Sequence, residues 1–439
     1  MSESVRLVAI ALPRPAAATA VVAAWEAGEA VLPLDPDAPA PELAGALAAA
    51  RPTHLLDGDG RSRLRGGEPV EPGIAAVVAT SGTNGPPKAV ELGADAISSS
   101  ALAVSAALEA GPGDRWLCCL PVHGVAGLAV LARAWRTGLP VEVHQRFDPA
   151  AVGAAAGRAT LVSLVPTMLR RLLAAGVEVA RFRRVLLGGG PIPADLIEEA
   201  AGLGVGLVRT YGLTETFGGV VHDGHPLDGV ELEIGGSGGL QPTPPEHRGS
   251  GGSRPGPPEH REPDGEILVR GPMLFRRYRG DPERTAAALR DGWLRTGDLG
   301  RLDPDGHLVV LGRRDELVIS GGINVHPAEV EAVLATHPAV AEAAVAGRPD
   351  QEWGQRVAAF VVPRDPAAPP TLAELRAFAL ERLAPAKAPR ELVLVPALPR
   401  GPSGKLLRRL LPEADVQDVP VAASPAARST ATDPAGKPT

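Results

Sequence analysis

The sequence predicts a layered α/β protein, with a large N-terminal domain followed by a small α+β C-terminal domain. Short apolar strand candidates alternate with helix-like stretches between residues 74 and 209, as in sheets whose strands are joined by helices. From 236 to 263 the composition changes to Gly, Ser, Pro and charged residues. Beyond this stretch, alternating polar and apolar residues at 266–270, 308–311 and 317–320 indicate antiparallel strands.

Size, charge and cysteine content restrict the classes of function. A chain of 439 residues can form two or three domains with sizeable cores. Its formal net charge of -7 provides no basic field, so nucleic acid is not an expected partner. No apolar run reaches the roughly 20 residues that span a bilayer, so we expect no stable membrane insertion. The two cysteines, Cys118 and Cys119, are adjacent, which suits neither a disulfide nor a metal site and fits a reducing cytoplasm.

The N-terminal domain is expected to span residues 1–312 and to begin with a β-α-β unit. An apolar strand at 5–12, a helix at 16–26 and a strand at 30–34 form this unit. Further buried strands are predicted at 74–79, 116–120, 141–144, 161–165, 185–187 and 206–209.

Two segments are predicted to be disordered. The stretch 236–263 contains Pro-Pro-Glu-His-Arg twice and too few apolar residues to form a core. We interpret it as a disordered insertion, with a binding loop as the alternative. The segment 412–439 is rich in Pro, Ala and Ser and is interpreted as a disordered tail.

The C-terminal domain is expected to span residues 313–411. Pro327 suits the first turn of a helix, and Val330, Val333 and Leu334 follow on one face. Thr371 and Glu374 have the spacing of a capping box before a second helix.

A loop suited to phosphate follows the strand at 74–79. It combines hydroxyl, amide and ammonium donors with glycines, so that its N–H and O–H groups can surround phosphate oxygens. The spacing is not that of a Walker motif, because no Gly-Lys-Ser/Thr ends it. The residues assigned to phosphate binding are Thr80, Ser81, Gly82, Thr83, Asn84, Gly85 and Lys88.

Two further polar segments follow strands and complete a predicted nucleotide pocket. Backbone without side chains lets a base approach, a tyrosine ring can stack on it, and a carboxylate can hold Mg²⁺. Each segment alone is also compatible with a plain turn. The base-binding residues are Gly188, Gly189, Gly190, Thr210, Tyr211, Gly212 and Thr214, and Glu215 is the magnesium carboxylate. Asp298 ends a later strand, where its carboxylate can accept hydrogen bonds from ribose hydroxyls.

Three further segments follow these motifs, at 312–316, 320–325 and 399–405. The order of all the motifs along the chain resembles that in the adenylate-forming superfamily of acyl-CoA synthetases, adenylation domains and luciferases. The resemblance covers residues 75–411. It implies an enzyme that uses ATP, Mg²⁺ and CoA on a small carboxylic acid, and it pairs Arg313 with Asp298 at the ribose. It further implies that the small domain is mobile and rotates about Asp315. Lys405 resembles the lysine that bridges the acyl carboxylate and the α-phosphate, and Gly321 and Gly322 resemble the lining of the pantetheine channel.

The sequence departs from the family pattern at three places. Asn84 stands where a second Thr or Ser is usual, and Ala89 where Gly is usual. In the segment 120–127, His123 takes a position that is usually aromatic, and Gly124 takes that of the usual histidine. His123 is therefore interpreted either as an acyl-site catalytic residue or as a structural histidine.

The acid is predicted from the short N-terminal part before the phosphate loop. Short family members include the o-succinylbenzoate:CoA ligases of menaquinone synthesis, and the segments 120–128, 163–172 and 216–224 are similar to theirs. The open alternatives are a medium-chain fatty or aryl acid:CoA ligase, a stand-alone adenylation domain that loads a carrier-protein thiol, and an inactive homologue. Intact Glu215, Asp298, Arg313 and Lys405 disfavour the last. The candidates for binding a second carboxylate are Ser163, Thr167, His123 and His222. The sequence does not indicate an oligomeric state.

Overall fold

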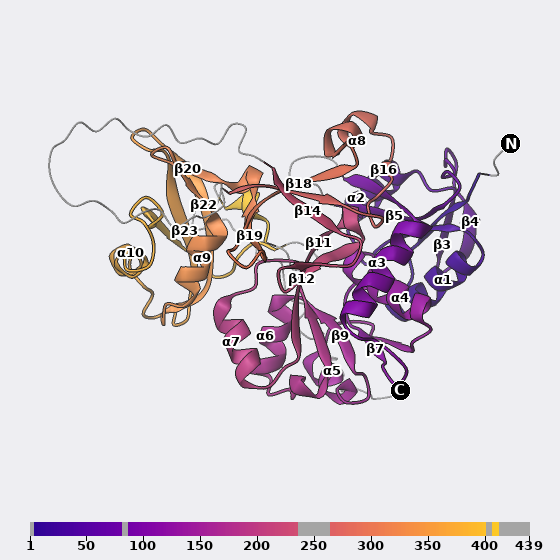
Figure 1. Cartoon of the computed structure of the whole chain (residues 1–439), viewed down its shortest axis with the longest axis horizontal. Helices are drawn as coiled ribbons and strands as arrows, with labels where there is room; N and C mark the ends of the chain where they lie inside the picture. The colour runs from indigo at the N-terminus through magenta and orange to yellow at the C-terminus, as the bar shows by residue number, and fades with distance from the viewer. Residues whose placement is uncertain (1–3, 81–86, 236–263, 401–405, 412–439) are drawn as a thin grey trace, which may run out of the picture.

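The computed structural model describes residues 4–80, 87–235, 264–400 and 406–411. Within them, four sheets and their helices form a large N-terminal domain and a smaller C-terminal domain, which lies at one end of the molecule (Figure 1). This confirms the predicted α/β class. The insertion 236–263 and the tail 412–439 fall outside the described residues.

The first sheet is seven-stranded and mixed. Its central strands β1, β2, β3 and β5 are parallel, and antiparallel neighbours flank them. From one edge to the other, the strands are β16 (Arg277–Tyr278), β6 (Lys88–Gly93), β5 (Ile74–Thr80), β2 (Ala30–Pro33), β1 (Leu7–Ile10), β3 (His54–Asp57) and β4 (Gly60–Arg63).

The second sheet also has seven strands, five of them parallel, and it carries both predicted base-binding segments. The strands are β13 (His225–Pro226), β12 (Gly218–His222), β11 (Leu207–Leu213), β10 (Arg184–Leu187), β9 (Leu161–Leu164), β7 (Trp116–Cys118) and β8 (Val141–Val143). The predicted strands at 116–120, 141–144, 161–165 and 185–187 are confirmed to within two residues at either end.

One apolar core joins the two sheets. Three helices contribute to it: α1 (Arg14–Glu26), α3 (Ala94–Ala107) and α4 (Val125–Thr137). The other face of the first sheet packs on α2 (Ala40–Ala50). The other face of the second sheet packs on α5 (Pro149–Ala155), α6 (Pro166–Ala174) and α7 (Ala194–Gly202), with the short helix η1 (Val179–Arg181) beside them. Parallel strands covered on both faces explain the continuous apolar runs in the sequence.

A third, antiparallel sheet connects the nucleotide region to the C-terminal domain. It consists of β14 (Glu231–Gly235), β15 (Gly265–Arg270), β18 (Trp293–Leu302) and β17 (Leu289–Arg290), with β19 (Leu308–Arg313) paired to β18. The helix α8 (Pro282–Ala288) precedes β17. Its N-cap carboxylate, on Asp281, accepts a hydrogen bond from the backbone N–H of Arg284.

The C-terminal domain is a sheet covered by two helices, α9 (Pro327–Ala335) and α10 (Leu372–Leu380). Both predicted helices are confirmed, and the side chains of Thr371 and Glu374 form the predicted capping box. The strands are β21 (Ile323–Val325), β20 (Val318–Ser320), β23 (Gly354–Pro363), β22 (Val340–Asp350) and β24 (Glu391–Leu394). The short helix η3 (Arg314–Glu316) follows β19, where the expected domain boundary lies. A second short helix, η4 (Arg408–Leu410), lies at the end of the described chain. No helix in the described ranges is long and apolar enough to cross a membrane.

Candidate functional site

The predicted phosphate loop is flanked by two paired strands. Thr80 is the last residue of β5 and Lys88 the first of β6, and the two are register partners. The loop therefore leaves and rejoins the sheet at one point. The predicted residues between them, Ser81, Gly82, Thr83, Asn84 and Gly85, lie outside the described part of the chain.

The two predicted base-binding segments lie in contact. A Cβ added to Gly188 would stand 2.7 Å from the carbonyl oxygen of Thr210, so only glycine permits this approach. Gly189 and Gly190 follow in an exposed turn, with Gly189 at a φ of +86°.

One prediction about this region was wrong. The strand at 206–209 does not end before Thr210 but continues as β11 to Leu213, where it pairs antiparallel with β12. A Cβ on Gly212 would lie 1.9 Å from the carbonyl oxygen of Gly218, so glycine is required there by the neighbouring strand. Thr210, Tyr211 and Gly212 are thus held on a strand, and Thr214 begins the short helix η2 (Thr214–Thr216).

The predicted ribose pair is assembled around Asp298. Arg313 is its register partner across β18 and β19, and its Nη1 lies 3.1 Å from Asp298 Oδ1. The hydroxyl of Tyr211 donates to Asp298 Oδ2 at 2.7 Å. Burial, followed by the charge of Asp298, raises the pKa of Tyr211 well above its usual value, so the phenol stays a donor. Burial lowers the pKa of Arg313, but Asp298 and Asp315 outweigh this and raise it. The arginine is therefore a permanent cation.

Glu215 is fixed by its own turn and by a distant segment. In η2, the backbone N–H of Leu213 donates to Thr216 Oγ1 at 2.9 Å, and this hydroxyl donates to the carbonyl of Gly218 at 2.7 Å. The carbonyl of Glu215 accepts a hydrogen bond from the backbone N–H of Phe275 at 2.7 Å. The turn closes at Phe217, which is fully buried and has a φ of +50°.

A tyrosine that the sequence did not single out contacts both Glu215, the predicted metal carboxylate, and Lys88 of the predicted phosphate loop. The hydroxyl of Tyr278 donates to Glu215 Oε1 at 2.7 Å. The ammonium of Lys88 lies 5.4 Å from the centre of its ring, a cation–π distance. No local pattern could have revealed this, because the contact depends on β16 pairing with β6, far away in sequence.

Glu215 fits the hard, oxygen-preferring Mg²⁺. One of its oxygens is held by Tyr278, and the other accepts no hydrogen bond from the described residues. Glu215 would therefore offer Mg²⁺ one carboxylate oxygen ligand, next to the predicted phosphate loop.

His123 lies near Asp35, an acidic residue just after strand β2 of the first sheet. Its Nδ1 is 3.9 Å from Asp35 Oδ2, too far for a hydrogen bond. Burial lowers the pKa of His123, and Asp35 only partly opposes this, so the ring is neutral near pH 7. Its role in the acyl site stays a prediction.

A buried arginine on α4 was missed by the sequence reading. Arg133 is 3% exposed, and its Nη1 donates to Ser163 Oγ at 3.3 Å. Its Nε has no hydrogen-bond partner among the described residues. Its guanidinium lies 5.4 Å from the ring centre of Trp116. No carboxylate pairs with it among the described residues. Burial lowers its pKa to about 10, so it remains charged at neutral pH.

Unsatisfied polar atoms gather near this cation. Within the part of the chain that the structure describes, neither ring nitrogen of His222 has a hydrogen-bond partner, and neither does the hydroxyl of its register partner Thr210. A Cβ on Gly219 would lie 2.2 Å from Thr210 Oγ1 and 3.3 Å from His222 Nε2, so both atoms face the same glycine. Burial, and then Arg133, lowers the pKa of His222 to about 4. An anion placed here would meet a cation and free donors.

Two of the four candidates for a second carboxylate therefore lie in this group, which we call the Arg133 cluster: Arg133, Ser163, Thr210 and His222. The other two candidates, Thr167 and His123, lie outside this cluster. Thr167 is exposed on α6, and His123 is beside Asp35. The signal in the sequence was weak: Arg133 is one of two arginines, with Arg136, in a helical segment that is mostly apolar.

The small-domain predictions lie on turns next to β18, β19 and β20. Asp315, in η3, accepts a hydrogen bond from Arg313 Nε at 3.2 Å. Gly321 and Gly322 form the tip between β20 and β21, both at positive φ. A Cβ on Gly321 would lie 2.6 Å from the indole of Trp353, so a side chain there would displace that ring. Lys405 lies outside the described residues.

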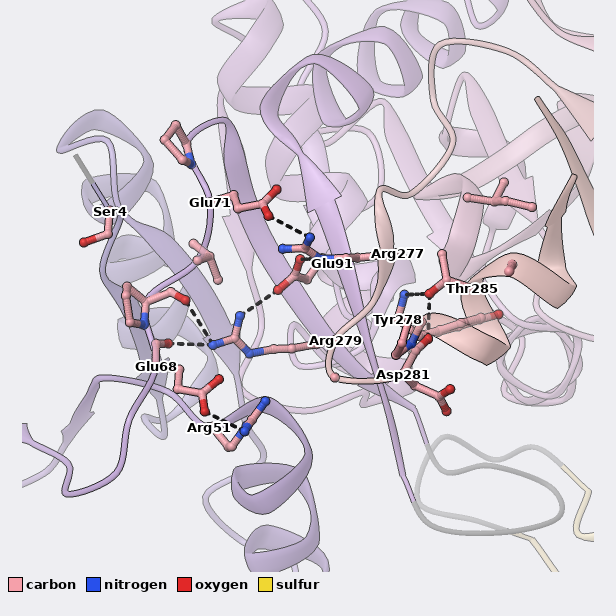
Figure 2. A pocket seen from close by; sticks show the side chains of 17 residues that line it. Ser4, Arg51, Glu68, Glu71, Glu91, Arg277, Tyr278, Arg279, Asp281 and Thr285 are labelled. Atoms are coloured by element: carbon pink, nitrogen blue, oxygen red, sulfur yellow. Dashed lines mark hydrogen bonds and ion pairs between the residues drawn. The ribbon is translucent and has the colours of Figure 1, made fainter. Parts of the chain in front are cut away.

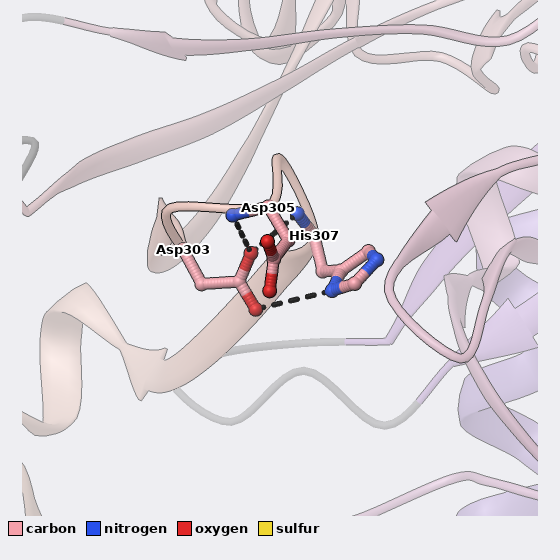
Figure 3. A group of neighbouring side chains, drawn as sticks. All are labelled: Asp303, Asp305 and His307. Carbon is pink, nitrogen blue, oxygen red and sulfur yellow. Dashed lines mark hydrogen bonds and ion pairs between the residues drawn. The ribbon is translucent and has the colours of Figure 1, made fainter.

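A further acidic group occupies the turn between β18 and β19, where Asp303, Asp305 and His307 bring their ligand atoms close together (Figure 3). The Oδ1 of Asp303 accepts hydrogen bonds from the backbone N–H groups of Asp305 and His307, at 3.0 and 2.8 Å. These bonds account for the cluster as the closure of a hairpin turn.

Comparison with known proteins gives the same domain order. The model of the AMP-binding enzyme family matches residues 65–279, and that of the AMP-binding enzyme C-terminal domain matches residues 329–405. A Mycobacterium tuberculosis protein named "Probable 2-succinylbenzoate–CoA ligase" is 41% identical over 369 residues, covering 80% of this chain and 88% of the relative. The 2-succinylbenzoate–CoA ligase of Bacillus subtilis is 39% identical over 359 residues, covering 77% of this chain and 69% of the relative.

Solved structures are similar over most of the chain. The o-succinylbenzoate CoA synthetase of Bacillus subtilis, in complex with the acyl-adenylate intermediate OSB-AMP, superposes with a TM-score of 0.80 at 32% identity, covering 94% of this chain and 89% of that one. ATP-bound MatB from Rhodopseudomonas palustris gives 0.79 at 28% identity, with the same coverage. Since both domains match and the relatives are aligned over most of their length, the chain belongs to the family of AMP-binding enzymes.

Proposed function

We propose that this chain is an ATP-dependent 2-succinylbenzoate–CoA ligase, which forms an acyl-adenylate and then the CoA thioester. Relatives with this name are about 40% identical over about 80% of the chain, and a structure with OSB-AMP superposes over 94% of it. The observation that carries the choice of acid is the Arg133 cluster.

2-Succinylbenzoate has two carboxylates with different fates. The succinyl carboxylate is activated, whereas the ring carboxylate stays charged and must be bound. A buried guanidinium without an anionic partner costs several kcal/mol, and a substrate carboxylate would remove that cost. Among the described residues, Arg133 Nε–H and the single N–H of the neutral His222 ring have no hydrogen-bond partner and can donate to such a group. A monocarboxylic fatty acid would leave these groups unsatisfied, which disfavours it as substrate.

In the first half-reaction, an oxygen of the succinyl carboxylate attacks the α-phosphorus of ATP and pyrophosphate leaves. Asp298 and Tyr211 hold the ribose and base side of the nucleotide, and Lys88 and the phosphate loop hold its phosphates. Lys405 is proposed to neutralise the two anions that must approach each other. Mg²⁺ bound at Glu215 supplies charge stabilisation at the phosphate oxygens.

In the second half-reaction, the sulfur of CoA attacks the acyl carbonyl and AMP leaves. Lys405 is not needed for this step, so rotation of the small domain about Asp315 can remove it. The glycine tip at Gly321 and Gly322 is then proposed to line the thiol channel. Domain motions of this kind take about microseconds to milliseconds and can limit turnover.

A panel of acids tests the proposal. Each acid would be incubated with the protein, ATP, Mg²⁺ and CoA, and the release of AMP and the mass of the thioester would be measured. The acids are 2-succinylbenzoate, 3-benzoylpropionate, benzoate, octanoate and malonate. We expect 2-succinylbenzoate to give the highest kcat/KM. A smooth optimum at some alkyl chain length, with 2-succinylbenzoate inert, would retain the ligase class and refute the acid. Replacing CoA by a phosphopantetheinylated carrier protein tests the stand-alone adenylation alternative.

A further inference from the structure

Tyr278 joins two parts of the site that the proposed mechanism treats separately. It lies on β16, is 5% exposed, and contacts both Glu215 and Lys88. We propose that Tyr278 is a positioning residue for the magnesium carboxylate: its hydroxyl fixes one oxygen of Glu215 so that the other is presented to the metal. The inference rests on the proposed role of Glu215.

The segment that carries Tyr278 holds Glu215 at two points. The backbone N–H of Phe275 donates to the carbonyl of Glu215 at 2.7 Å, and the Tyr278 hydroxyl donates to Oε1 at 2.7 Å. Backbone and side chain of the glutamate are therefore both fixed by four consecutive residues. Because a carboxylate can rotate about its last bond, only the second contact determines which oxygen faces the site.

Tyr278 is itself held by a buried ion-pair clamp. Glu91, on β6, is fully buried and accepts from Arg277 Nε at 2.8 Å and Arg279 Nη1 at 2.7 Å, the residues on either side of Tyr278 (Figure 2). The backbone N–H of Arg279 donates to the carbonyl of Ala89 at 2.8 Å. Since β6 begins at Lys88, the same strand fixes both the lysine and the tyrosine.

A cavity lies outside this clamp, but its arginines are not available to bind an anion. It has a volume of about 790 Å³ and contains three arginines. Arg51 pairs with Glu68, Arg277 with Glu71 and Glu91, and Arg279 with Glu91. Their charges are already neutralised, so the clamp is a support for Tyr278 and not an anion site.

The phenol is a donor under all ordinary conditions. Burial, followed by the charge of Glu215, raises the pKa of Tyr278. The hydroxyl therefore keeps its proton and gives it to the carboxylate in a charge-assisted hydrogen bond. Outer-shell partners of this kind change metal affinity or activity about 10- to 100-fold when removed.

The test is Tyr278→Phe, which keeps the ring under Lys88 and beside Phe275 and removes only the hydroxyl. ATP binding would be measured by calorimetry with and without Mg²⁺, and Mn²⁺ binding to the ATP-bound protein by electron paramagnetic resonance. We expect metal affinity to fall about 10- to 100-fold. ATP binding without metal should change less than about twofold, because the phosphate and ribose contacts are unchanged.

Two variants make the outcome decisive. Glu215→Gln should lose the metal dependence by at least as much. Tyr211→Phe, which removes the matching hydroxyl from Asp298, should weaken ATP binding equally with and without metal. The inference is overturned if Tyr278→Phe binds metal like the wild type, if it weakens ATP binding equally in both conditions, or if Glu215→Gln keeps normal metal dependence. None of these readouts uses the acid, so failure of the substrate proposal is detected separately.

Discussion

Replacing Arg133 by Met should separate recognition of the substrate from stability of the fold. The side chain is 3% exposed, and its one hydrogen bond, to Ser163, is 3.3 Å long. Methionine fills a similar volume without charge. If Arg133 serves the ring carboxylate, the variant should lose activity with 2-succinylbenzoate and keep its fold.

The magnitude follows from burial. Removing one partner of a buried, hydrogen-bonded charge pair costs about 2–5 kcal/mol, or roughly 30- to 5,000-fold in kcat/KM. The free energy of unfolding, in contrast, should rise or stay the same. Lowering the pKa of Arg133 from 12.5 to about 10 corresponds to about 3 kcal/mol against the folded state. The lost hydrogen bond and cation–π contact are together worth about 1.5–3 kcal/mol. We therefore expect an unfolding free energy equal to the wild type or about 1 kcal/mol higher.

The assay compares 2-succinylbenzoate with 3-benzoylpropionate, which has the same reacting arm and no ring carboxylate. Arg133→Met should lower kcat/KM about 30- to 5,000-fold for the first acid and leave the second within about threefold. Equal losses for both acids, or a drop in unfolding free energy above about 2 kcal/mol in urea, would show that Arg133 is structural and refute the reasoning.

Three other perturbations test separate parts of the account. Lys405→Ala should reduce adenylation about 10²- to 10³-fold while thioester formation from pre-made acyl-adenylate is largely kept; equal loss of both half-reactions would contradict the role. Deleting 236–263 and joining β14 to β15 by a short Gly/Ser turn should change the rate of adenylation less than about tenfold. The two strands are antiparallel neighbours, and loop length affects closure entropy only weakly. A larger loss would reveal a role for the insertion. The pKa of His222 falls from 6.5 to about 4 on folding, so between these pH values the folded state binds fewer protons than the unfolded state. The free energy of unfolding should therefore decrease as the pH falls from 6.5 toward 4, by up to about 3 kcal/mol. His222→Asn should show a smaller decrease in urea titrations at about pH 7 and about pH 5, and an identical pH dependence would contradict the assignment.

The pattern of the sequence predicted the sheets because their signals are local, whereas the pairing of Asp298 with Arg313 was implied by the resemblance to the family. Buried parallel strands read as apolar runs, and β5 and β10 were located within one residue. Asp298 and Arg313 were expected together, and strand pairing places them opposite each other. The error at β11 arose because the polar, glycine-containing segment from Thr210 was interpreted as following the strand, whereas in the fold it continues the strand and pairs with β12.

Contacts between distant segments could not be predicted in the same way. Tyr278 reaches Glu215 only because β16 pairs with β6, and nothing near Tyr278 in sequence indicates that pairing. Arg133 carried a weak signal as a charge in an apolar helix. Its lack of an anionic partner became visible only when the surrounding strands were in place.

Acid-dependent exchange of labelled pyrophosphate into ATP, without CoA, tests the central claim most directly. It reports reversible formation of the acyl-adenylate and is independent of the thiol step. We expect rapid exchange with 2-succinylbenzoate and Mg²⁺. With 3-benzoylpropionate, exchange should be slower by about 10³-fold or more, because a pocket built for a buried polar group rejects an analogue that lacks it. No exchange with 2-succinylbenzoate, or equal exchange with both acids, would contradict it.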